Sequence, residues 1–236
     1  MRLLIDGDPI VYRIAFASQK KQEDGSVKAD PESYTLHSCK LYMSDLVRDT
    51  GCKSYKVFLS GKPNFRDKVR ADYKGNRSKA VKPIHYQLIR DYLEERFKAQ
   101  VVNGMEADDA LGLAQEPDHS TAIATIDKDL LMVEGLHYNY NTREWKTVSA
   151  EEGTRFFYKQ MLTGDRVDNI TGIRGIGDKK ADKLLDKNDN WDKLIVDMYL
   201  DEFDNGFQRA VENSQLLWML QRGKEMPIDF YEQAKV

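Results

Sequence analysis

Short apolar runs alternate with longer helical segments through the first part of the chain, and this alternation constrains the fold more than any other feature. Four runs have the length of buried strands, at residues 3–5, 55–59, 100–102 and 121–126. The intervening segments place apolar residues at the spacing of one helix face, at 9–18, 34–48, 83–98 and 107–114. The pattern predicts an α/β fold with a mostly parallel sheet and helices on both faces. Residues 136–148 are expected to add a hairpin at one edge.

Beyond about residue 150 the strand pattern stops, and helical stretches follow at 150–162, 179–185, 191–200 and 206–221. We therefore expect two domains, an α/β domain at 1–150 and a smaller helical domain at 151–236. The composition is that of a globular protein, with 41% hydrophobic and 32% charged residues. No apolar run approaches the roughly 18 residues that span a membrane. The two cysteines provide neither a disulfide framework nor a thiolate zinc site, so we expect a cytoplasmic protein without a membrane partner.

Acidic residues cluster after three of the expected strands and once more farther along the chain. The clusters are Asp6 with Asp8, then Glu106, Asp108 and Asp109, then Asp127 with Asp129, and finally Asp165 with Asp168. The last two are three residues apart, so we expect them on one helix face. Because ligands of parallel α/β sheets bind beyond the carboxyl ends of the strands, the clusters are expected to meet at one edge.

Each acidic cluster could by itself be a helix cap or a solvated turn, but four at one edge favour a metal site. Clusters made only of oxygen ligands select hard cations, which here means Mg²⁺ or Mn²⁺. The number of carboxylates exceeds what one octahedral ion uses, so we expect two ions. Such a pair suits in-line attack on a phosphodiester.

Positive charge is concentrated in residues 62–82, although the whole chain carries a net charge of −3. This segment holds eight basic and two acidic residues, and its "RADYKGNRSK" places an aromatic residue among cations. The pattern is typical of a surface that binds a phosphate backbone and stacks a base. A solvated charged face is the alternative.

A glycine-rich turn occurs in "TGIRGIGDKKADKLL", with Gly172, Gly175 and Gly177 ahead of Lys179 and Lys180. Glycines allow the backbone to approach an anion closely, and the helix that follows offers free N–H groups. We interpret residues 170–186 as a helix-hairpin-helix, a tight turn between two short helices. This motif binds the DNA backbone without sequence preference. A glycine turn between two core helices is the alternative.

Taken in order, these segments resemble the 5′→3′ exonuclease and flap-endonuclease family, most closely its small bacteriophage members. The resemblance covers nearly the whole chain and rests on "LLIDGD", "VFLSGKPNFR", "YKGNR", "GMEADDALG", "IDKDL" and "GDRVDNITGIRGIGDKKA". It implies a PIN-like nuclease domain with a basic arch at about 62–82, joined to a helix-3-turn-helix module that often binds K⁺. The implied activity is two-metal hydrolysis of DNA near 5′ ends, at a nick, flap or duplex end, with RNA–DNA hybrids as a further candidate substrate. A monomer in the bacterial host cytoplasm, serving phage DNA replication or degradation, is expected.

The resemblance also implies roles for individual residues. The metal-binding acids are Asp6, Glu106, Asp108, Asp109, Asp127, Asp129, Asp165 and Asp168, and the catalytic cations are Lys74 and Arg77. Tyr12 matches an aromatic that stacks on the terminal base, with helical packing as the alternative. From the basic segment and the glycine turn themselves, the expected DNA-binding residues are Arg66, Arg70, Tyr73, Lys79, Gly172, Gly175, Gly177, Lys179 and Lys180. The sequence departs from the family at Ser60, where members carry an aspartate; Asp8 and Asp67 are the candidates to replace it.

Two other functions are compatible with parts of the sequence. "LLIDGD" also resembles the nucleophile motif of haloacid-dehalogenase-type phosphatases, but that function leaves "YKGNR" and the glycine turn unexplained. A DNA-end binding protein whose catalysis was lost at Ser60 is the second alternative. The remaining acids argue against it, because an inactive site has no need for charges that repel one another.

Overall fold

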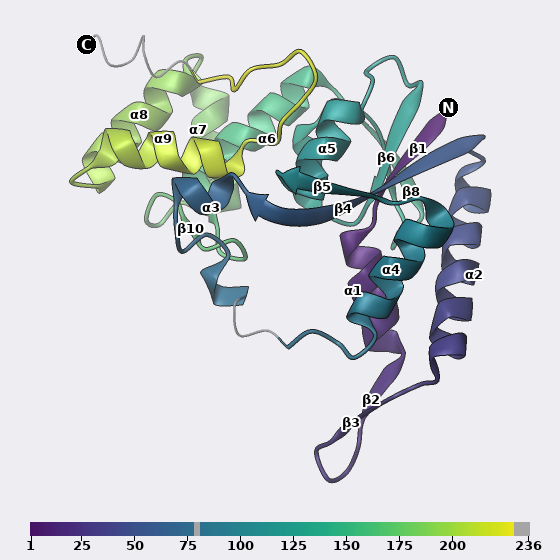
Figure 1. The fold of residues 1–236 in the computed structure, drawn as a ribbon. Helices are drawn as coiled ribbons and strands as arrows, with labels where there is room; N and C mark the ends of the chain where they lie inside the picture. The colour runs from purple at the N-terminus through teal and green to yellow at the C-terminus, as the bar shows by residue number, and fades with distance from the viewer. Residues whose placement is uncertain (78–80, 229–236) are drawn as a thin grey trace.

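The computed structural model describes residues 1–77 and 81–228, and within them a six-stranded sheet forms the centre of the molecule (Figure 1). Its strand order is β5-β4-β1-β6-β7-β8. Their bounds are β1 (Arg2–Asp6), β4 (Ser54–Asn64), β5 (Gln100–Gly104), β6 (Thr121–Thr125), β7 (Gly135–Asn139) and β8 (Glu144–Val148). All neighbours pair in parallel except β7 and β8, which form an antiparallel edge hairpin. The mostly parallel sheet and its edge hairpin are confirmed.

Helices cover both faces of this sheet, as predicted. One face carries α1 (Asp8–Ala17), α2 (Glu32–Thr50) and α4 (Tyr86–Phe97), which share a buried apolar cluster with alternate residues of the strands. The opposite face carries α5 (Ala107–Ala114). Because successive side chains of a strand point to opposite faces, Leu3 and Ile5 enter the first cluster while Leu4 enters the second.

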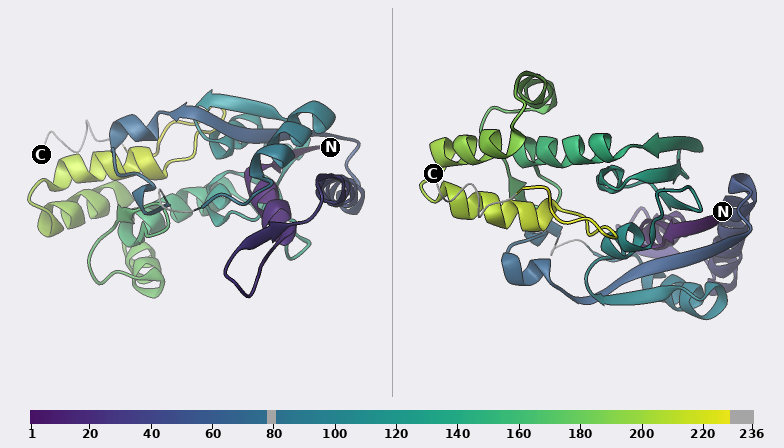
Figure 2. Two further views of the ribbon diagram at one scale, coloured as in Figure 1. Left: turned by 60° about the horizontal axis from the view of Figure 1, so that its bottom comes forward. Right: turned by 90° about the horizontal axis from the view of Figure 1, so that it is seen from above.

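Four further helices gather at one end of the molecule, as Figures 1 and 2 show. They are α6 (Ala150–Thr163), α7 (Asp178–Lys187), α8 (Trp191–Glu202) and α9 (Gly206–Leu217). The apolar cluster under α5 continues into all four, so the division into domains at residue 150 stays a prediction. No helix within the described ranges is long and apolar enough to cross a membrane.

A small ribbon of two strands interrupts the helical part, where the sequence pattern indicated no strands. It consists of β9 (Gly164–Asp165) and β10 (Ile170–Thr171), paired antiparallel. The expectation that Asp165 and Asp168 share a helix face is therefore wrong, because both belong to this ribbon and its turn. The side chain of Asp165 accepts hydrogen bonds from the backbone N–H of Val167 and Asp168, which stabilises the turn in place of a helix.

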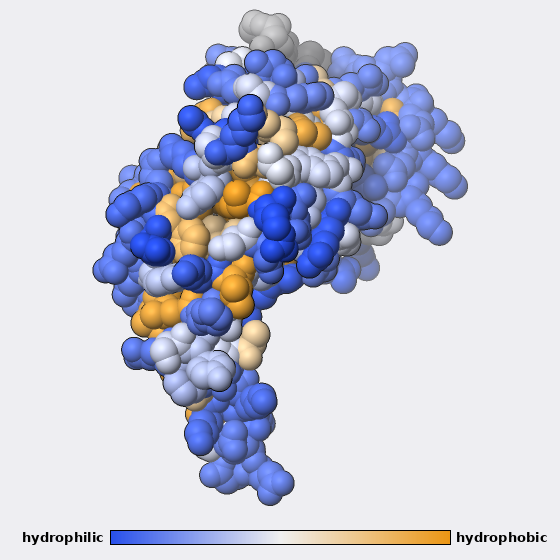
Figure 3. All heavy atoms as spheres, turned by 90° about the vertical axis from the view of Figure 1, so that its right-hand side faces the viewer, coloured by the Kyte–Doolittle hydropathy of each residue, from blue (hydrophilic) through white to orange (hydrophobic). Residues whose placement is uncertain are grey.

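The basic segment at 62–82 leaves the sheet at the end of β4 and runs toward the C-terminal helices. It forms α3 (Arg66–Val69), which packs on α9, and then the 3-10 turn η1 (Gly75–Arg77). A separate hairpin, β2 (Gln19–Lys21) with β3 (Val27–Ala29), projects from the body and has a hydrophilic tip (Figure 3).

Candidate functional site

Carboxylates from three strand ends come together at the carboxyl edge of the sheet. Asp6 ends β1, Asp127 follows β6, and Asp108 stands in the first turn of α5. Burial, followed by the charges of Asp8 and Asp127, raises the pKa of Asp6 to about 8. Burial and the charges of Asp6, Asp127 and Glu106 raise the pKa of Asp108 well above its ordinary value. These mutual effects show that the acids lie close enough to repel one another.

A second acidic group adjoins the first through Asp127. Burial, then the charges of Asp127 and Asp165, raise the pKa of Asp129 to about 7. Gln160 donates a hydrogen bond of 2.6 Å from Nε2 to Oδ1 of Asp129 and so orients that carboxylate from α6. In the first group, Thr125 Oγ1 donates to Oδ2 of Asp6 at 2.8 Å. A cavity of about 450 Å³ between the groups is lined by Pro9, Ile126, Asp127, Lys128, Asp129, Asp165 and Val167.

The donor set fits hard divalent cations. In the described part of the chain no three acidic, histidine or cysteine side chains converge into a ready-made metal cage. However, burial and neighbouring carboxylates raise the pKa of Asp6, Asp108 and Asp129, and a divalent cation would stabilise such an arrangement, in which every donor is an oxygen. The chemistry of the donors therefore agrees with Mg²⁺ or Mn²⁺.

Lys74 lies within the acidic cluster. Its ammonium group is 2.5 Å from Oε1 of Glu106 and 3.4 Å from Oδ2 of Asp168. The backbone N–H of Lys74 also donates to the carbonyl oxygen of Asp168 at 3.1 Å, with Lys74 in a left-handed conformation at φ 54°. The hydroxyl of Tyr73 lies 3.1 Å from each of the same two carboxylates. Lys74 and Tyr73 thus connect the segment at 62–82 to acids from α5 and from the β9–β10 turn.

Tyr73 does not face a base-binding surface. It is buried, and burial together with the charges of Glu106 and Asp168 raises the pKa of its hydroxyl. Stacking of Tyr73 on DNA does not agree with this position. In the sequence, the signal for this buried position is that Tyr73 directly precedes Lys74, just before the turn at Gly75.

Arg66 and Asp109 form an ion pair in the interior. Two guanidinium nitrogens of Arg66 lie 2.5 and 2.9 Å from the two carboxylate oxygens of Asp109, and both side chains are fully buried. Arg66 also donates to the carbonyl oxygens of Leu216 and Trp218, while Asp109 accepts from the backbone N–H of Leu220. The expected roles of Arg66 in DNA binding and of Asp109 in metal binding do not agree with this burial, because each side chain is enclosed and occupied by the other.

Ser60, the position at which the resemblance leads us to expect an aspartate, positions the start of α5. Its hydroxyl accepts from the backbone N–H of Ala107 at 2.9 Å. Its own N–H donates to Asp8 Oδ2 at 2.9 Å, and Arg90 holds the other oxygen of Asp8 at 3.0 Å. Asp8 therefore lies beside Ser60, whereas Asp67 is exposed on α3.

Arg90, Thr125 and Gln160 were not singled out from the sequence. Each acts on a carboxylate from a different element, and a hydroxyl, an amide or a helical arginine carries no motif of its own.

The remaining DNA-binding candidates are placed unevenly. Arg70 is mostly buried and contacts Asp72 and Asn213, so it does not present a free guanidinium to DNA. Tyr12 is 39% exposed on α1 and packs against Phe16 and Tyr86, with ring centroids 6.2 and 5.0 Å apart. The backbone of Arg77 belongs to η1, but its side chain and the whole of Lys79 lie outside the described residues.

The glycine turn precedes α7 and borders a cavity of about 770 Å³. Gly175 has φ +72°, and a side chain at Gly172 would meet the backbone of Gly164 at 2.3 Å. Lys179 and Lys180 are exposed in the first turns of α7. The element before the turn is the β9–β10 ribbon, so the two-helix arrangement expected here is replaced by a ribbon and one helix.

Comparisons with known proteins agree with this geometry. A family model described as the 5′-3′ exonuclease, N-terminal resolvase-like domain matches residues 1–159. The 5′-3′ exonuclease of Mycoplasma pneumoniae is 28% identical over 219 residues, which cover 82% of this chain and 74% of that protein. DNA polymerase I of Streptococcus pneumoniae is 28% identical over 204 residues, which cover 78% of this chain but only 23% of the polymerase.

Solved structures share the fold. T5 5′-exonuclease with bound zinc has a TM-score of 0.63 at 19% identity, over 92% of this chain and 86% of that one. The catalytic core of Rad2 in complex with a DNA substrate has a TM-score of 0.55 at 15% identity, over 89% and 70%. Because the family model covers more than half of its residues, the chain belongs to the 5′-3′ exonuclease and flap-endonuclease family and is a nuclease.

Proposed function

We propose that the protein is a divalent-metal-dependent 5′→3′ exonuclease and flap endonuclease that hydrolyses DNA phosphodiesters near 5′ ends. The observation that carries this proposal is the convergence of Asp6, Asp108 and Asp127 at one sheet edge, where burial and the neighbouring carboxylates raise the pKa of Asp6 and of Asp108. Zinc in the T5 5′-exonuclease structure and DNA in the Rad2 structure support metal and DNA as the partners. RNA–DNA hybrids are a further candidate substrate.

Two ions are proposed, Mg²⁺ or Mn²⁺, one for each acidic group. Asp6, Asp108 and Asp127 would hold the first ion, and Asp129, Asp165 and Asp168 the second. When bound, such ions supply Lewis-acid activation at the phosphate and stabilise the charge that develops there. Thr125 and Gln160 keep one carboxylate of each group in a fixed orientation through their hydrogen bonds.

Lys74 is proposed to act on the scissile phosphate. It lies 2.5 Å from Glu106, within the acidic cluster, so a small movement of the turn before η1 would bring its ammonium group to a phosphate held there. A cation placed in advance beside developing negative charge lowers the barrier to hydrolysis. Arg77 is proposed to assist it, on the strength of the "YKGNR" motif alone.

The glycine turn and the exposed lysines of α7 are proposed to bind the duplex away from the cleavage point. Backbone N–H groups at Gly175 and Gly177 and the charges of Lys179 and Lys180 would contact phosphates without reading sequence. A K⁺ ion at this turn is also proposed, because the family resemblance extends over it. We place a monomeric enzyme in the cytoplasm, that of a bacterial host for a phage protein, in DNA replication or degradation.

The proposal is tested with a 5′-labelled nicked duplex and a 5′-flap substrate, each incubated with Mg²⁺, with Mn²⁺ and with EDTA. We expect short labelled products that EDTA abolishes. Asp108→Asn and Asp127→Asn should abolish cleavage while DNA binding persists. Normal turnover by either variant would contradict the assignment of Asp108 or Asp127 as a metal ligand. Cleavage in EDTA would contradict the metal dependence.

The comparisons lend no support to the phosphatase or to the non-catalytic DNA-end binder. The same assay separates them, since a phosphatase releases phosphate from small monoesters without cutting DNA. An inactive end binder gives salt-sensitive DNA binding and no product with either metal.

A further inference from the structure

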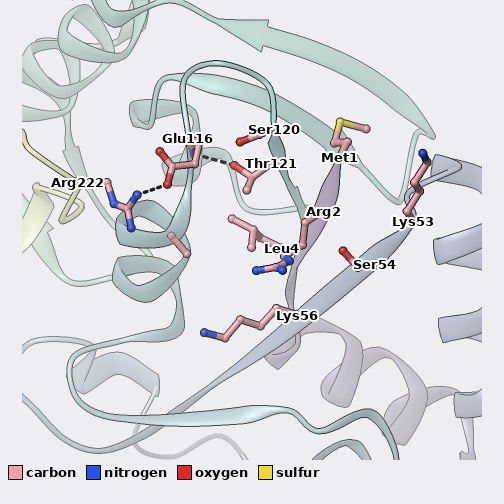
Figure 4. A pocket seen from close by; sticks show the side chains of 11 residues that line it. Met1, Arg2, Leu4, Lys53, Ser54, Lys56, Glu116, Ser120, Thr121 and Arg222 are labelled. Atoms are coloured by element: carbon pink, nitrogen blue, oxygen red, sulfur yellow. Dashed lines mark hydrogen bonds and ion pairs between the residues drawn. The ribbon is translucent and has the colours of Figure 1, made fainter.

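A second cavity lies at the opposite edge of the central sheet, at the amino ends of β1, β4 and β6 (Figure 4). It measures about 560 Å³, and its lining residues from the strands include Arg2, Leu4, Lys56 and Thr121. The acidic cluster stands at the carboxyl ends of the same strands. A strand of five residues spans about 17 Å, so this cavity is separate from the proposed nuclease site.

The pairing register explains why the cavity is basic. Arg2 pairs with Ser54 and Leu4 pairs with Lys56, so the charged residues of β1 and β4 share one face of the sheet with Leu4. On this face α5 ends at Ala114, which lines the cavity. The side chains of Arg2, Lys53 and Lys56 are exposed beside it.

The positive charge of this cavity is not neutralised. Among the described residues, no carboxylate forms an ion pair with Arg2, Lys53 or Lys56. Arg222 at the rim is paired with Glu116. The backbone N–H of Glu116 donates a hydrogen bond to Thr121 Oγ1 at 2.7 Å.

Figure 4 shows the charged ends of Arg2 and Lys56 turned toward the side on which Arg222 stands. The cavity thus offers clustered cations above an apolar floor that includes Leu4 and Ala114.

We propose that this cavity binds a phosphate monoester of nucleotide size, such as a 5′-mononucleotide. Its volume lies within the range of small-molecule sites, about 300–1,000 Å³. The guanidinium of Arg2 can contact two phosphate oxygens at once, and Lys56 adds a point charge. Leu4 and Ala114 provide an apolar surface for a sugar or base. An acidic protein segment is less well matched, because the cations gather around one compact space rather than along a groove.

The test is a calorimetric titration of the full chain with dAMP, with inorganic phosphate and with deoxyadenosine, in low salt and EDTA. EDTA removes divalent ions, so the result is independent of the nuclease site and of its proposed function. Lys56→Glu reverses one charge of the cavity, and Lys40→Glu on the exposed face of α2 is the matched control. Arg2→Gln, which removes the charge of an exposed side chain while keeping it polar, is the second variant.

We expect saturable binding of dAMP, weakened about tenfold or more by Lys56→Glu and by Arg2→Gln and unchanged by Lys40→Glu. Deoxyadenosine, which lacks the phosphate, should not bind, and inorganic phosphate should bind more weakly than dAMP. No saturable binding of dAMP would overturn the proposal. Equal binding of phosphate and dAMP, or an unaltered affinity in Lys56→Glu, would also overturn it.

Discussion

Asp108 and Asp109 are neighbours in the chain, yet α5 turns their carboxylates into different surroundings. Asp108 meets other acids at the sheet edge, whereas Asp109 meets Arg66 in the interior. The sequence predicts that acids crowd this helix start, because they follow an apolar strand. It does not predict which acid is paired, because Arg66 lies 43 residues earlier in the chain and only the packing of α3 brings it there.

Substitutions at these two neighbours should have opposite effects on stability. Asp109→Asn leaves the buried Arg66 with only the more distant carboxylate of Glu106, at 3.6 Å, so we expect the free energy of unfolding to fall by about 3–5 kcal/mol with little change in Mn²⁺ affinity. Asp108→Asn removes repulsion, so the metal-free protein should become more stable while Mn²⁺ affinity falls. Denaturant titration in EDTA and Mn²⁺ calorimetry measure both quantities. If Asp109→Asn lost metal binding without losing stability, Asp109 would instead be a metal ligand.

We expect Lys74 to compete with metal ions, because one of its two carboxylate partners, Asp168, is a proposed metal ligand and the other, Glu106, adjoins the acidic cluster. Because its ammonium group lies 2.5 Å from Glu106 and 3.4 Å from Asp168, Lys74→Met should raise the affinity for Mn²⁺ by about tenfold in the absence of DNA. Turnover should fall even at saturating metal. Lys68→Met, on the exposed side of α3, serves as the control. An affinity equal to that of the unmodified protein would show that Lys74 does not compete.

At the scale of elements, the sequence predicts the central strands and the helices well, because each buries a regular apolar pattern. The strand predicted at 55–59 is shorter than β4, which continues to Asn64 after its apolar run ends at Leu59. The additional residues pair with β5 through backbone hydrogen bonds, which leave no pattern in the side chains. The sequence misses β2 and β3 because their exposed residues show no burial pattern. The helix predicted from Pro83 begins only at Tyr86, whose N–H donates to the carbonyl of Pro83.

The first turns of α7 are the element on which the DNA-binding proposal depends. Replacing both Lys179 and Lys180 by glutamate should weaken duplex binding and reduce the slope of log K against log salt by about 2, since each lysine accounts for roughly one released counterion. Lys40→Glu on α2 should leave the slope unchanged. Fluorescence anisotropy over a series of salt concentrations measures this slope for each variant. An unchanged slope in the double variant would place the duplex elsewhere.

At the scale of the whole molecule, the acidic edge is expected to couple folding to pH and to metal. The pKa of Asp6 is raised to about 8 and that of Asp129 to about 7, above their value in an unfolded chain. The folded state therefore holds more protons than the unfolded state across the interval from about pH 4 to pH 8. The stability that these groups contribute is present below pH 4 and is lost as the pH rises through their folded pKa values.

This coupling predicts a pH-dependent effect of Mg²⁺ on the melting temperature. At pH 8.5 the acids are ionised and repel one another, so Mg²⁺ should raise the melting temperature by several degrees. At pH 6 protons compete with the ion, and the rise should be smaller. Asp127→Asn should reduce the difference between the two pH values. Calorimetric scans in Mg²⁺ and in EDTA test this, and an equal rise at both pH values would contradict it.

The contacts of Arg66 also set an order of events during synthesis. The carbonyls of Leu216 and Trp218 that hold Arg66, and the N–H of Leu220 that holds Asp109, are made after every strand of the central sheet. A chain that is still on the ribosome can pair its strands but cannot complete the surroundings of this ion pair beneath α5. The packing beneath α5, the helix that carries Asp108, is therefore completed only after α9 and the residues that follow it have been translated.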